Sequence, residues 1–182
     1  MRKKRIKRTI AAFTVLLAIA ALMLNLNRII ASRYEILGAD VSHWQGDVDF
    51  SLLEQQGVRF AFIKATEGSA HVDEKFEENL ARVRGTDMKF GFYHFFSFDS
   101  PGETQAENYI ARVPALENLL PPVIDVEYYG DYFRHPPEIE PVQTQLRAMI
   151  DRLEAHYGKK PILYATQRAY RRYIQGAFDD CD

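Results

Sequence analysis

From Tyr34 onward, apolar and polar positions follow two patterns in turn. Short apolar runs bounded by turn residues predict buried strands, and segments with apolar residues every three or four positions predict helices. The predicted strands cover 36–41, 58–65, 89–96, 123–127 and 161–165. The predicted helices cover 51–56, 74–84, 103–113, 141–156 and 167–174. Regular alternation of strand and helix predicts a parallel sheet with right-handed crossovers, either doubly wound or a barrel.

Polar side chains fall late in each predicted strand or directly after it. They are Asp40, Glu67, His94, Asp125, Glu127 and Tyr164. Barrel enzymes assemble their active sites from these C-terminal strand ends, so the placement favours a barrel. A dinucleotide-binding fold needs a glycine-rich turn after its first strand, and ADVSHWQG has none. Walker and Gly-x-Ser-x-Gly motifs are also absent, which excludes those phosphate and serine-nucleophile sites.

The stretch PPVIDVEYYG holds two acids two positions apart in an apolar run. Side chains alternate along a strand, so Asp125 and Glu127 point to the same face, roughly 6.6 Å apart at about 3.3 Å per residue. Two carboxyl groups close together resist joint ionisation, which raises the pKa of one of them and suits acid/base chemistry. In the alternative interpretation, both acids meet water or cap the next element at the end of the strand.

The N-terminal segment has the pattern of an export signal. Six Lys and Arg residues lie within the first eight positions, and an apolar run follows from Ile10 to Leu24. Further apolar residues extend this run toward the roughly 20 residues that span a bilayer. We expect a cytoplasmic basic segment at 1–9, a transmembrane signal-anchor at 10–30 and a linker at 31–35. Cleavage after Ala18-Ile19-Ala20, which would release a secreted protein, is the alternative.

Charge and composition narrow the choice of partners. Residues 1–33 carry eight basic and no acidic residues, so residues 34–182 have a formal charge of −10. An acidic body without a clustered basic face argues against a nucleic-acid partner. Cys181 is the single cysteine, and the five histidines lack HxH or HExxH spacing. The sequence therefore predicts no intrachain disulfide, no metal site and no cofactor.

Five blocks, in this order and at these spacings, resemble the lysozymes (muramidases) of glycoside hydrolase family 25, over roughly residues 36–168. The blocks are GADVSHWQGDVDF, FAFIKATEG, FGFYHFF, PPVIDVE and KPILYAT. The resemblance implies a distorted TIM-like β/α barrel over residues 36–182. It also implies cleavage of the β-1,4 bond between N-acetylmuramic acid and N-acetylglucosamine in peptidoglycan.

The resemblance further implies roles for single residues. Glu127 would be the general acid, Asp125 its partner and Asp40 a third essential acid. Tyr93, His94 and Tyr164 would line the sugar subsite. Among the remaining candidates, Trp44 and Tyr129 present rings that can stack on sugars, and Glu67 can contact substrate or support the strand end through an ion pair with Lys64. An i, i+2 spacing lies between the carboxyl separations of retaining and inverting glycosidases, so it decides neither outcome.

Only five strand and helix units are predicted, whereas a closed barrel has eight strands. The later blocks of the family have no counterpart after Ile174, so we expect an incomplete barrel of about five strands, truncated at its C-terminal side. Two functions follow. The first is a membrane-anchored muramidase with its catalytic domain outside the cytoplasm. The second is an inactive remnant that at most binds cell-wall glycan.

Overall fold

The structure, a computed structural model, describes residues 34–116 and 118–181. The predicted signal-anchor at 10–30 and the basic segment at 1–9 lie outside the described residues. Within the described part of the chain, no helix combines the length and the apolar character that crossing a bilayer requires. Residues Gly38–Asp182 make up one compact unit, and the arrangement below is that of this unit.

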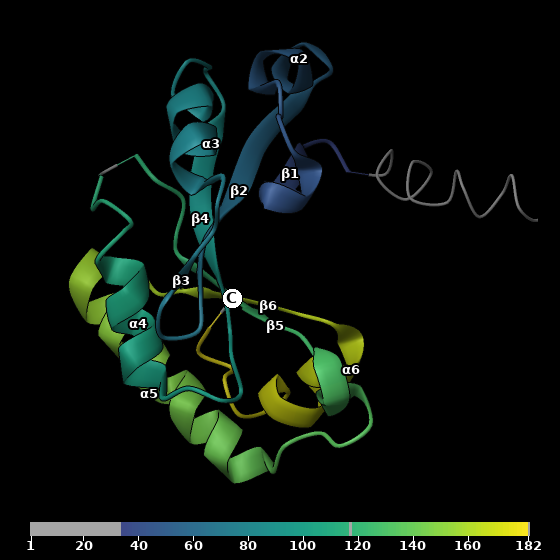
Figure 1. The fold of residues 1–182 in the computed structure, drawn as a ribbon, viewed down its shortest axis with the longest axis vertical. Coiled ribbons are helices and arrows are strands. Elements are labelled where there is room, and N and C mark those ends of the chain that lie inside the picture. Colours follow the sequence, from purple (N-terminus) through teal and green to yellow (C-terminus); the bar gives the residue numbers. More distant parts are fainter. Residues whose placement is uncertain (1–33, 117, 182) are drawn as a thin grey trace, which may run out of the picture. The chain divides into compact units, whose positions relative to one another are not determined.

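A mixed sheet organises the unit (Figure 1). Its strands are β1 (Leu37–Val41), β2 (Val58–Glu67), β3 (His71–Val72), β4 (Lys89–Phe95), β5 (Val123–Val126) and β6 (Ile162–Ala165). The order is β1-β2-β4-β5-β6, with β3 paired antiparallel to β2. Pairing is parallel from β2 through β4 and β5 to β6. All five predicted strands are confirmed, and the short hairpin strand β3 was not predicted.

Helices connect the strands. They are α2 (Phe50–Gln55), α3 (Phe76–Val83), α4 (Gly102–Ile110), α5 (Ile139–Tyr157) and α6 (Gln167–Ala169), with 3-10 turns η1 (His43–Gln45) and η2 (Gly130–Phe133). The helix predicted at 167–174 is α-helical only in its first turn and continues as the π-helical segment η3 (Tyr170–Ile174). There the Gln175 amide donates to the Tyr170 carbonyl, five residues back, so the turn is wider than an α-turn.

The two faces of the sheet differ in chemistry because successive side chains alternate in direction. Ala61, Ile63, Phe92, Ile124 and Val126 are 0–1% exposed and form the core. The intervening positions of the same strands point to the opposite face. That face carries Phe60 and Phe62 from β2, Tyr93 and Phe95 from β4, and Asp125 from β5. Asp125 therefore lies on the face of the sheet opposite the hydrophobic core.

A bulge near the end of β2 changes this alternation. The pairing register with β4 shifts between Lys64, opposite Tyr93, and Thr66, opposite His94. An extra residue at Ala65 turns the following side chains over, as β-bulges do. Lys64 and Glu67 therefore reach the same side of the sheet although they are three positions apart, and their side chains form an ion pair at 2.7 Å.

Close contact between α4 and α5 requires glycine at position 102. A Cβ built on Gly102 would lie 1.8 Å from the Gln145 carbonyl oxygen. The Gly102 amide also donates to the Gln145 side-chain oxygen at 2.7 Å. Among the described residues the strands form a curled half-barrel, and the expectation of a TIM-like barrel with about five strands holds to that extent.

Candidate active site

The predicted acids meet at the C-terminal edge of the sheet. Strand register places Asp125 of β5 beside Phe95 on one side and Tyr164 on the other, and Glu127 follows directly after β5. Asp40 lies late in β1. A cavity of about 350 Å³ opens here, lined by Gly38, Ala39, Asp40, Phe60, Phe62, Tyr93, Val123, Asp125, Ile162 and Tyr164. Its floor is apolar and its rim carries carboxyl and phenol groups.

Asp125 is the most strongly perturbed acid of this group. Burial, followed by repulsion from Glu127 and Asp40, raises its pKa to about 8, although the Lys64 ammonium acts in the opposite direction. Its Oδ1 atom is buried and has no hydrogen-bond partner among the described residues. At neutral pH this carboxyl group is therefore largely protonated, and one of its oxygens is left for a ligand.

Glu127 has a raised pKa for a related reason. Burial contributes most and the negative charge of Asp40 adds to it. Glu127 is nevertheless more accessible than Asp125, because it lies beyond the end of β5. The site thus holds one deep and one accessible carboxyl group, both biased toward the protonated form. Such a pair can supply a proton to a bound substrate.

Two tyrosines complete the rim. Burial, and then the charge of Asp125, raise the pKa of Tyr93 well above its usual value, while a hydrogen bond with Ser42 partly opposes this shift. Burial, Glu127 and Asp125 raise the pKa of Tyr164 as well, and that ring is 59% exposed. Both phenols stay protonated at any physiological pH and remain hydrogen-bond donors.

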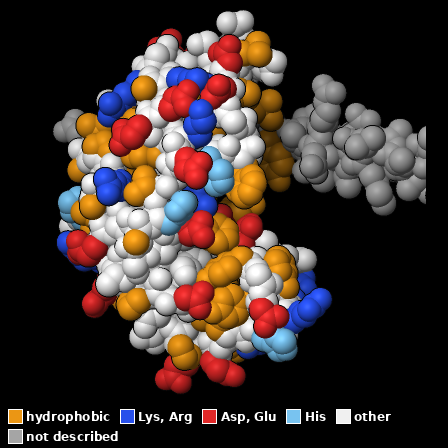
Figure 2. Space-filling model, in the orientation of Figure 1, with side chains coloured by type: hydrophobic (Ala, Val, Ile, Leu, Met, Phe, Trp, Pro, Cys, Tyr) orange, Lys and Arg blue, Asp and Glu red, His pale blue; other side chains and the backbone are white. Residues whose placement is uncertain are grey.

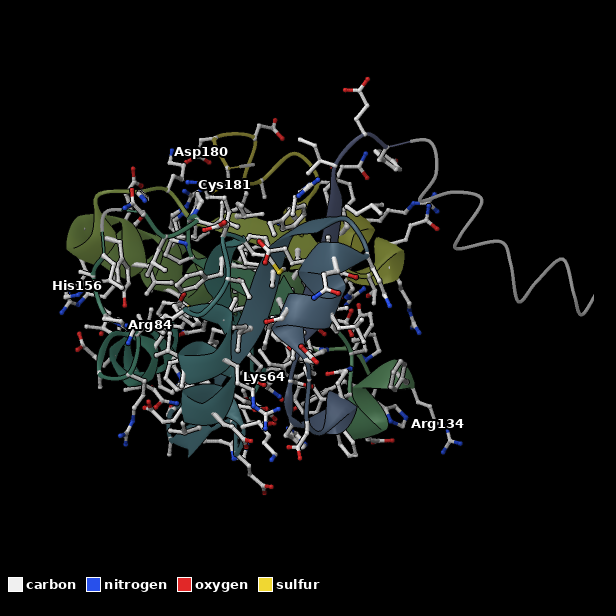
Figure 3. The ribbon with its side chains drawn as sticks, turned by 90° about the horizontal axis from the view of Figure 1, so that it is seen from above. Lys64, Arg84, Arg134, His156, Asp180 and Cys181 are labelled. Atoms are coloured by element: carbon white, nitrogen blue, oxygen red, sulfur yellow. The ribbon has the colours of Figure 1, made fainter. Side chains whose placement is uncertain are left out.

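Lys64 lies among the side chains at the centre of the view in Figure 3. It is 5% exposed, and its ammonium lies 5.0 Å from the centre of the Phe95 ring. Its partner Glu67 is part-exposed at the same strand end. The predicted supporting ion pair is therefore present, and Lys64 brings a positive charge toward the acids.

His94 does not line the cleft, and this corrects the expectation from the sequence. Its side chain points to the helix-covered face of β4 and is fully buried. One ring nitrogen, Nδ1, lies 2.7 Å from the Thr66 hydroxyl, and the other, Nε2, lies 3.0 Å from the Gln105 side-chain oxygen. The FGFYHFF block places Tyr93 and His94 on opposite faces because neighbours in a strand alternate.

Burial of His94 predicts a loss of stability in acid. Burial lowers its pKa from 6.5 to about 4, so between these pH values the unfolded chain binds a proton that the folded chain excludes. The His94 contribution to the free energy of unfolding should therefore fall as pH drops from 6.5 to 4, by roughly 3 kcal/mol at 1.36 kcal/mol per pKa unit. Urea unfolding at several pH values measures it. A His94→Gln variant with an undiminished acid slope would contradict the assignment.

Trp44 lies at an exposed turn after β1. It is 81% exposed, and its ring centre is 4.7 Å from that of His43. Asp73, which is buried, accepts hydrogen bonds from the His43 amide at 3.2 Å and from the Lys75 amide at 3.0 Å, and the His43 Nδ1 lies 2.7 Å from it. This network fixes the turn and leaves the indole ring open to a ligand.

Tyr129 is held mainly by the loop that follows β4. Its hydroxyl accepts from the Phe98 amide at 3.0 Å and donates to Asp99 at 2.9 Å. Its ring stacks on Phe98 with 5.8 Å between centres. Tyr132 also donates to Asp99. These contacts tie the segment after Glu127 to the neighbouring loop, so Tyr129 positions that segment whether or not its ring contacts a ligand.

Hydrophobic side chains (orange) gather on the surface over the segment that contains η2 (Figure 2). Phe133 contributes to the exposed apolar area there, at 58% exposure.

Within residues 34–116 and 118–181, no group of three or more His, Cys, Asp or Glu side chains is arranged to hold a metal ion.

Sequence reasoning missed several residues that shape the site. Phe60 and Phe62 form its floor. Asp73 hydrogen-bonds to His43, and Ser42 hydrogen-bonds to Tyr93, at its rim. The Gln105 side-chain oxygen lies 3.0 Å from Nε2 of His94. Phe60 and Phe62 alternate with the buried Ala61 and Ile63, a signal that was present in FAFIKAT. No local sequence pattern pointed to Asp73, because its hydrogen-bond partner His43 lies thirty positions away in the chain.

Comparison with known proteins agrees with this geometry. The sequence profile described as Glycosyl hydrolases family 25 matches residues 39–181. A solved family 25 glycosyl hydrolase from Bacillus anthracis is 57% identical, with a TM-score of 0.81; the alignment covers 82% of this chain and 69% of that one. The bacterial lysozyme from Streptomyces coelicolor is 27% identical with a TM-score of 0.69, covering 76% and 66%.

Among curated proteins, the uncharacterized protein YegX from Escherichia coli K12 is 32% identical over 156 residues, which is 83% of this chain and 56% of that protein. The chain thus spans just over half the length of this relative. Lysozyme M1 from Streptomyces globisporus is 35% identical over 97 residues, or 51% of this chain and 33% of its own length. The profile match over most of the described residues, together with the shared fold, shows that this chain belongs to family 25 of the glycosyl hydrolases.

Proposed function

We propose that the protein is a peptidoglycan hydrolase, a muramidase that cleaves the β-1,4 bond between N-acetylmuramic acid and N-acetylglucosamine. The observation that carries this proposal is the pair Asp125 and Glu127 at the cleft, both with raised pKa. Family membership supports it, as do relatives named lysozyme and N,O-diacetylmuramidase.

In this proposal Glu127 is the general acid. Its accessible carboxyl group donates a proton to the glycosidic oxygen as the bond from that oxygen to the sugar C1 breaks, and the oxygen keeps the bonding electron pair. Positive charge develops at C1 and the ring oxygen. Water then adds at C1 and returns a proton to the Glu127 carboxylate. Raised pKa values suit this cycle, because the acid must be protonated at the working pH.

Asp125 is the partner in the same proposal. Its unpaired Oδ1 is available to the 2-acetamido group of the substrate, which it can orient for attack on C1, or, in the ionised form of Asp125, to the developing positive charge. The negative charge of Asp40 helps to keep the pKa values of the pair raised. Tyr93 and Tyr164 then donate hydrogen bonds from the rim, and Trp44, Tyr129 and Glu67 are candidates for further sugar contacts.

A cell-wall glycan-binding module without turnover is the second candidate, favoured by the half-barrel form of the described sheet. Release of reducing ends from purified peptidoglycan separates the two. The full chain should release them, and its Glu127→Gln variant should bind the same material without releasing them. Binding by both proteins with no release by either would favour the module.

We also propose that residues 10–30 anchor the protein in the cell membrane, with the catalytic domain outside the cytoplasm. Six basic residues before an apolar run support this orientation. The expressed protein should stay in the membrane fraction at full mass, and protease added from the outer side should remove its C-terminal domain. A soluble species that begins after Ala20 would instead indicate cleavage and secretion.

A further inference from the structure

A second pocket lies between the start of α5 and the segment formed by α6 and η3. Its volume is about 480 Å³, and it is lined by Pro136, Ile139, Gln167, Arg168, Arg171 and Arg172. Three of these six residues are arginines, and no acidic residue lines the pocket. This concentration of positive charge is unusual in a body with a formal charge of −10 over residues 34–182.

Two other arginines, both on α5, are paired with carboxylates. Arg147 of α5 forms an ion pair with Asp180 at 2.9 Å, and Arg152 forms one with Glu107 at 2.6 Å. The pocket arginines make no ion pair within the part of the chain that the structure describes, although Glu138 and Glu140 lie nearby at the start of α5. Their charge is therefore available to an external anion.

Two of the guanidinium groups are held in place by neutral contacts. Arg168 donates to the Phe133 carbonyl at 2.8 Å, and its guanidinium carbon lies 5.0 Å from the centre of the Tyr128 ring. Arg172 donates to the Pro137 carbonyl at 3.0 Å. Each guanidinium has five N–H groups in a planar fork, so most donors remain free for a planar oxyanion such as a carboxylate.

The pocket shares an edge of the sheet with the catalytic acids. Helix α6 begins two residues after β6 ends. Phe133, which accepts from Arg168, closes the turn η2 that begins three residues after Glu127. A ligand that lies across Asp125 and Glu127 therefore has the arginines along the same edge of the sheet, because both follow the C-terminal ends of neighbouring strands.

We propose that this pocket binds the carboxylates of the peptide that N-acetylmuramic acid carries in peptidoglycan. The inference rests on the proposed function and adds a specificity site to it. That peptide is attached to the sugar next to the bond that is cleaved, and its free carboxylates match the forked guanidinium groups. The pocket then favours glycan that still carries its peptides over glycan that has been stripped of them.

The first test compares the full chain with Arg171→Gln, since the Arg171 side chain makes no hydrogen bond or ion pair with the described residues. The measured quantity is the ratio of kcat/KM on peptide-bearing glycan to kcat/KM on glycan stripped of peptide. We expect this ratio to fall about 3- to 10-fold, as loss of a partly exposed charged hydrogen bond would produce. Arg84→Gln is the matched control, at the exposed end of α3, and should shift the ratio less than twofold. Figure 3 shows Arg84 well separated from Arg134, the residue that follows η2.

The second test needs no turnover, so it separates failure of this inference from failure of the proposed function. Binding of the Glu127→Gln chain to a synthetic muramic-acid peptide is measured with the peptide carboxylates free and with them amidated. The free form should bind about 3- to 10-fold more tightly, and adding Arg171→Gln should remove the difference. Equal binding of both forms would overturn the proposal. Stronger competition by a phosphodiester polymer would also overturn it, because the pocket would then select phosphate.

Discussion

Glu127→Gln should abolish most hydrolysis of peptidoglycan while the domain stays folded. A glutamine side chain matches glutamate in shape but cannot deliver a proton to the glycosidic oxygen. General acids of this kind contribute about 10²- to 10⁴-fold to the rate, and we expect a loss of that order in kcat. The structure supports this choice of residue, because the accessible carboxyl group of Glu127 is biased toward its protonated form by burial and by Asp40.

Thermal melts measured beside reducing-end release separate a catalytic from a structural role. The melting temperature of Glu127→Gln should be unchanged or slightly higher, since a repulsive acid is removed from a crowded acidic site. If Asp125 and Glu127 only stabilised the end of β5, the Glu127→Gln variant would lose stability and activity together. Substantial hydrolysis by a well-folded Glu127→Gln protein would rule out Glu127 as the general acid.

Asp125→Asn should lower turnover and raise stability at the same time. Loss of the carboxyl group removes the partner that orients the acetamido group or stabilises positive charge at C1, and we expect a decrease of about 10²-fold or more in kcat. The stability gain arises because the folded state holds this group at an unfavourable site. Burial and the neighbouring charges of Glu127 and Asp40 raise its pKa from 3.8 to about 8.

The gain in stability that we expect for Asp125→Asn increases as pH rises. Between pH 3.8 and 8 the unfolded chain has released the Asp125 proton, whereas the folded chain retains it. Rising pH therefore favours unfolding through this group, and the penalty grows to several kcal/mol by pH 8 at 1.36 kcal/mol per pKa unit. Asn carries no such penalty.

Urea unfolding of Asp125→Asn and of the unsubstituted chain at pH 4, 6 and 8 measures this difference. The variant should be more stable at pH 8, and the two proteins should converge near pH 4. A Glu103→Gln control, at an exposed position early in α4, should show no comparable pH dependence. If the variant were less stable than the parent at pH 8, the ionised Asp125 carboxyl group would have favourable partners in the folded state. That result would contradict the unfavourable burial and repulsion described above.

His94 and Asp125 give opposite slopes in the range where both titrate. Between pH 4 and 6.5, acidification destabilises the fold through the buried imidazole and stabilises it through the buried carboxyl group. The two single variants, His94→Gln and Asp125→Asn, should therefore move the pH of maximum stability in opposite directions.

The sequence by itself determined the elements and the pairing of the acids. Apolar runs and helical spacing located β1, β2, β4, β5 and β6 and the helices between them, because period and turn residues are local properties of the chain. The same rule predicts Asp125 and Glu127 on one face, since alternation needs only the two residues and an extended backbone between them. The i, i+3 ion pair of Lys64 and Glu67 was also expected, but the bulge that allows it was not.

Only the tertiary structure decided which face each polar group occupies and what surrounds it. Tyr93 and His94 are neighbours in the chain, yet the packing of α4 buries His94 against Gln105 while Tyr93 opens to the cleft. The pKa of Asp125 depends on Asp40 and Lys64, which come from other strands. The arginine pocket depends on the carbonyl groups of Phe133 and Pro137, which hold Arg168 and Arg172. Long-range packing brings these groups together, and no local pattern encodes their distances, because burial and charge act through space rather than along the chain.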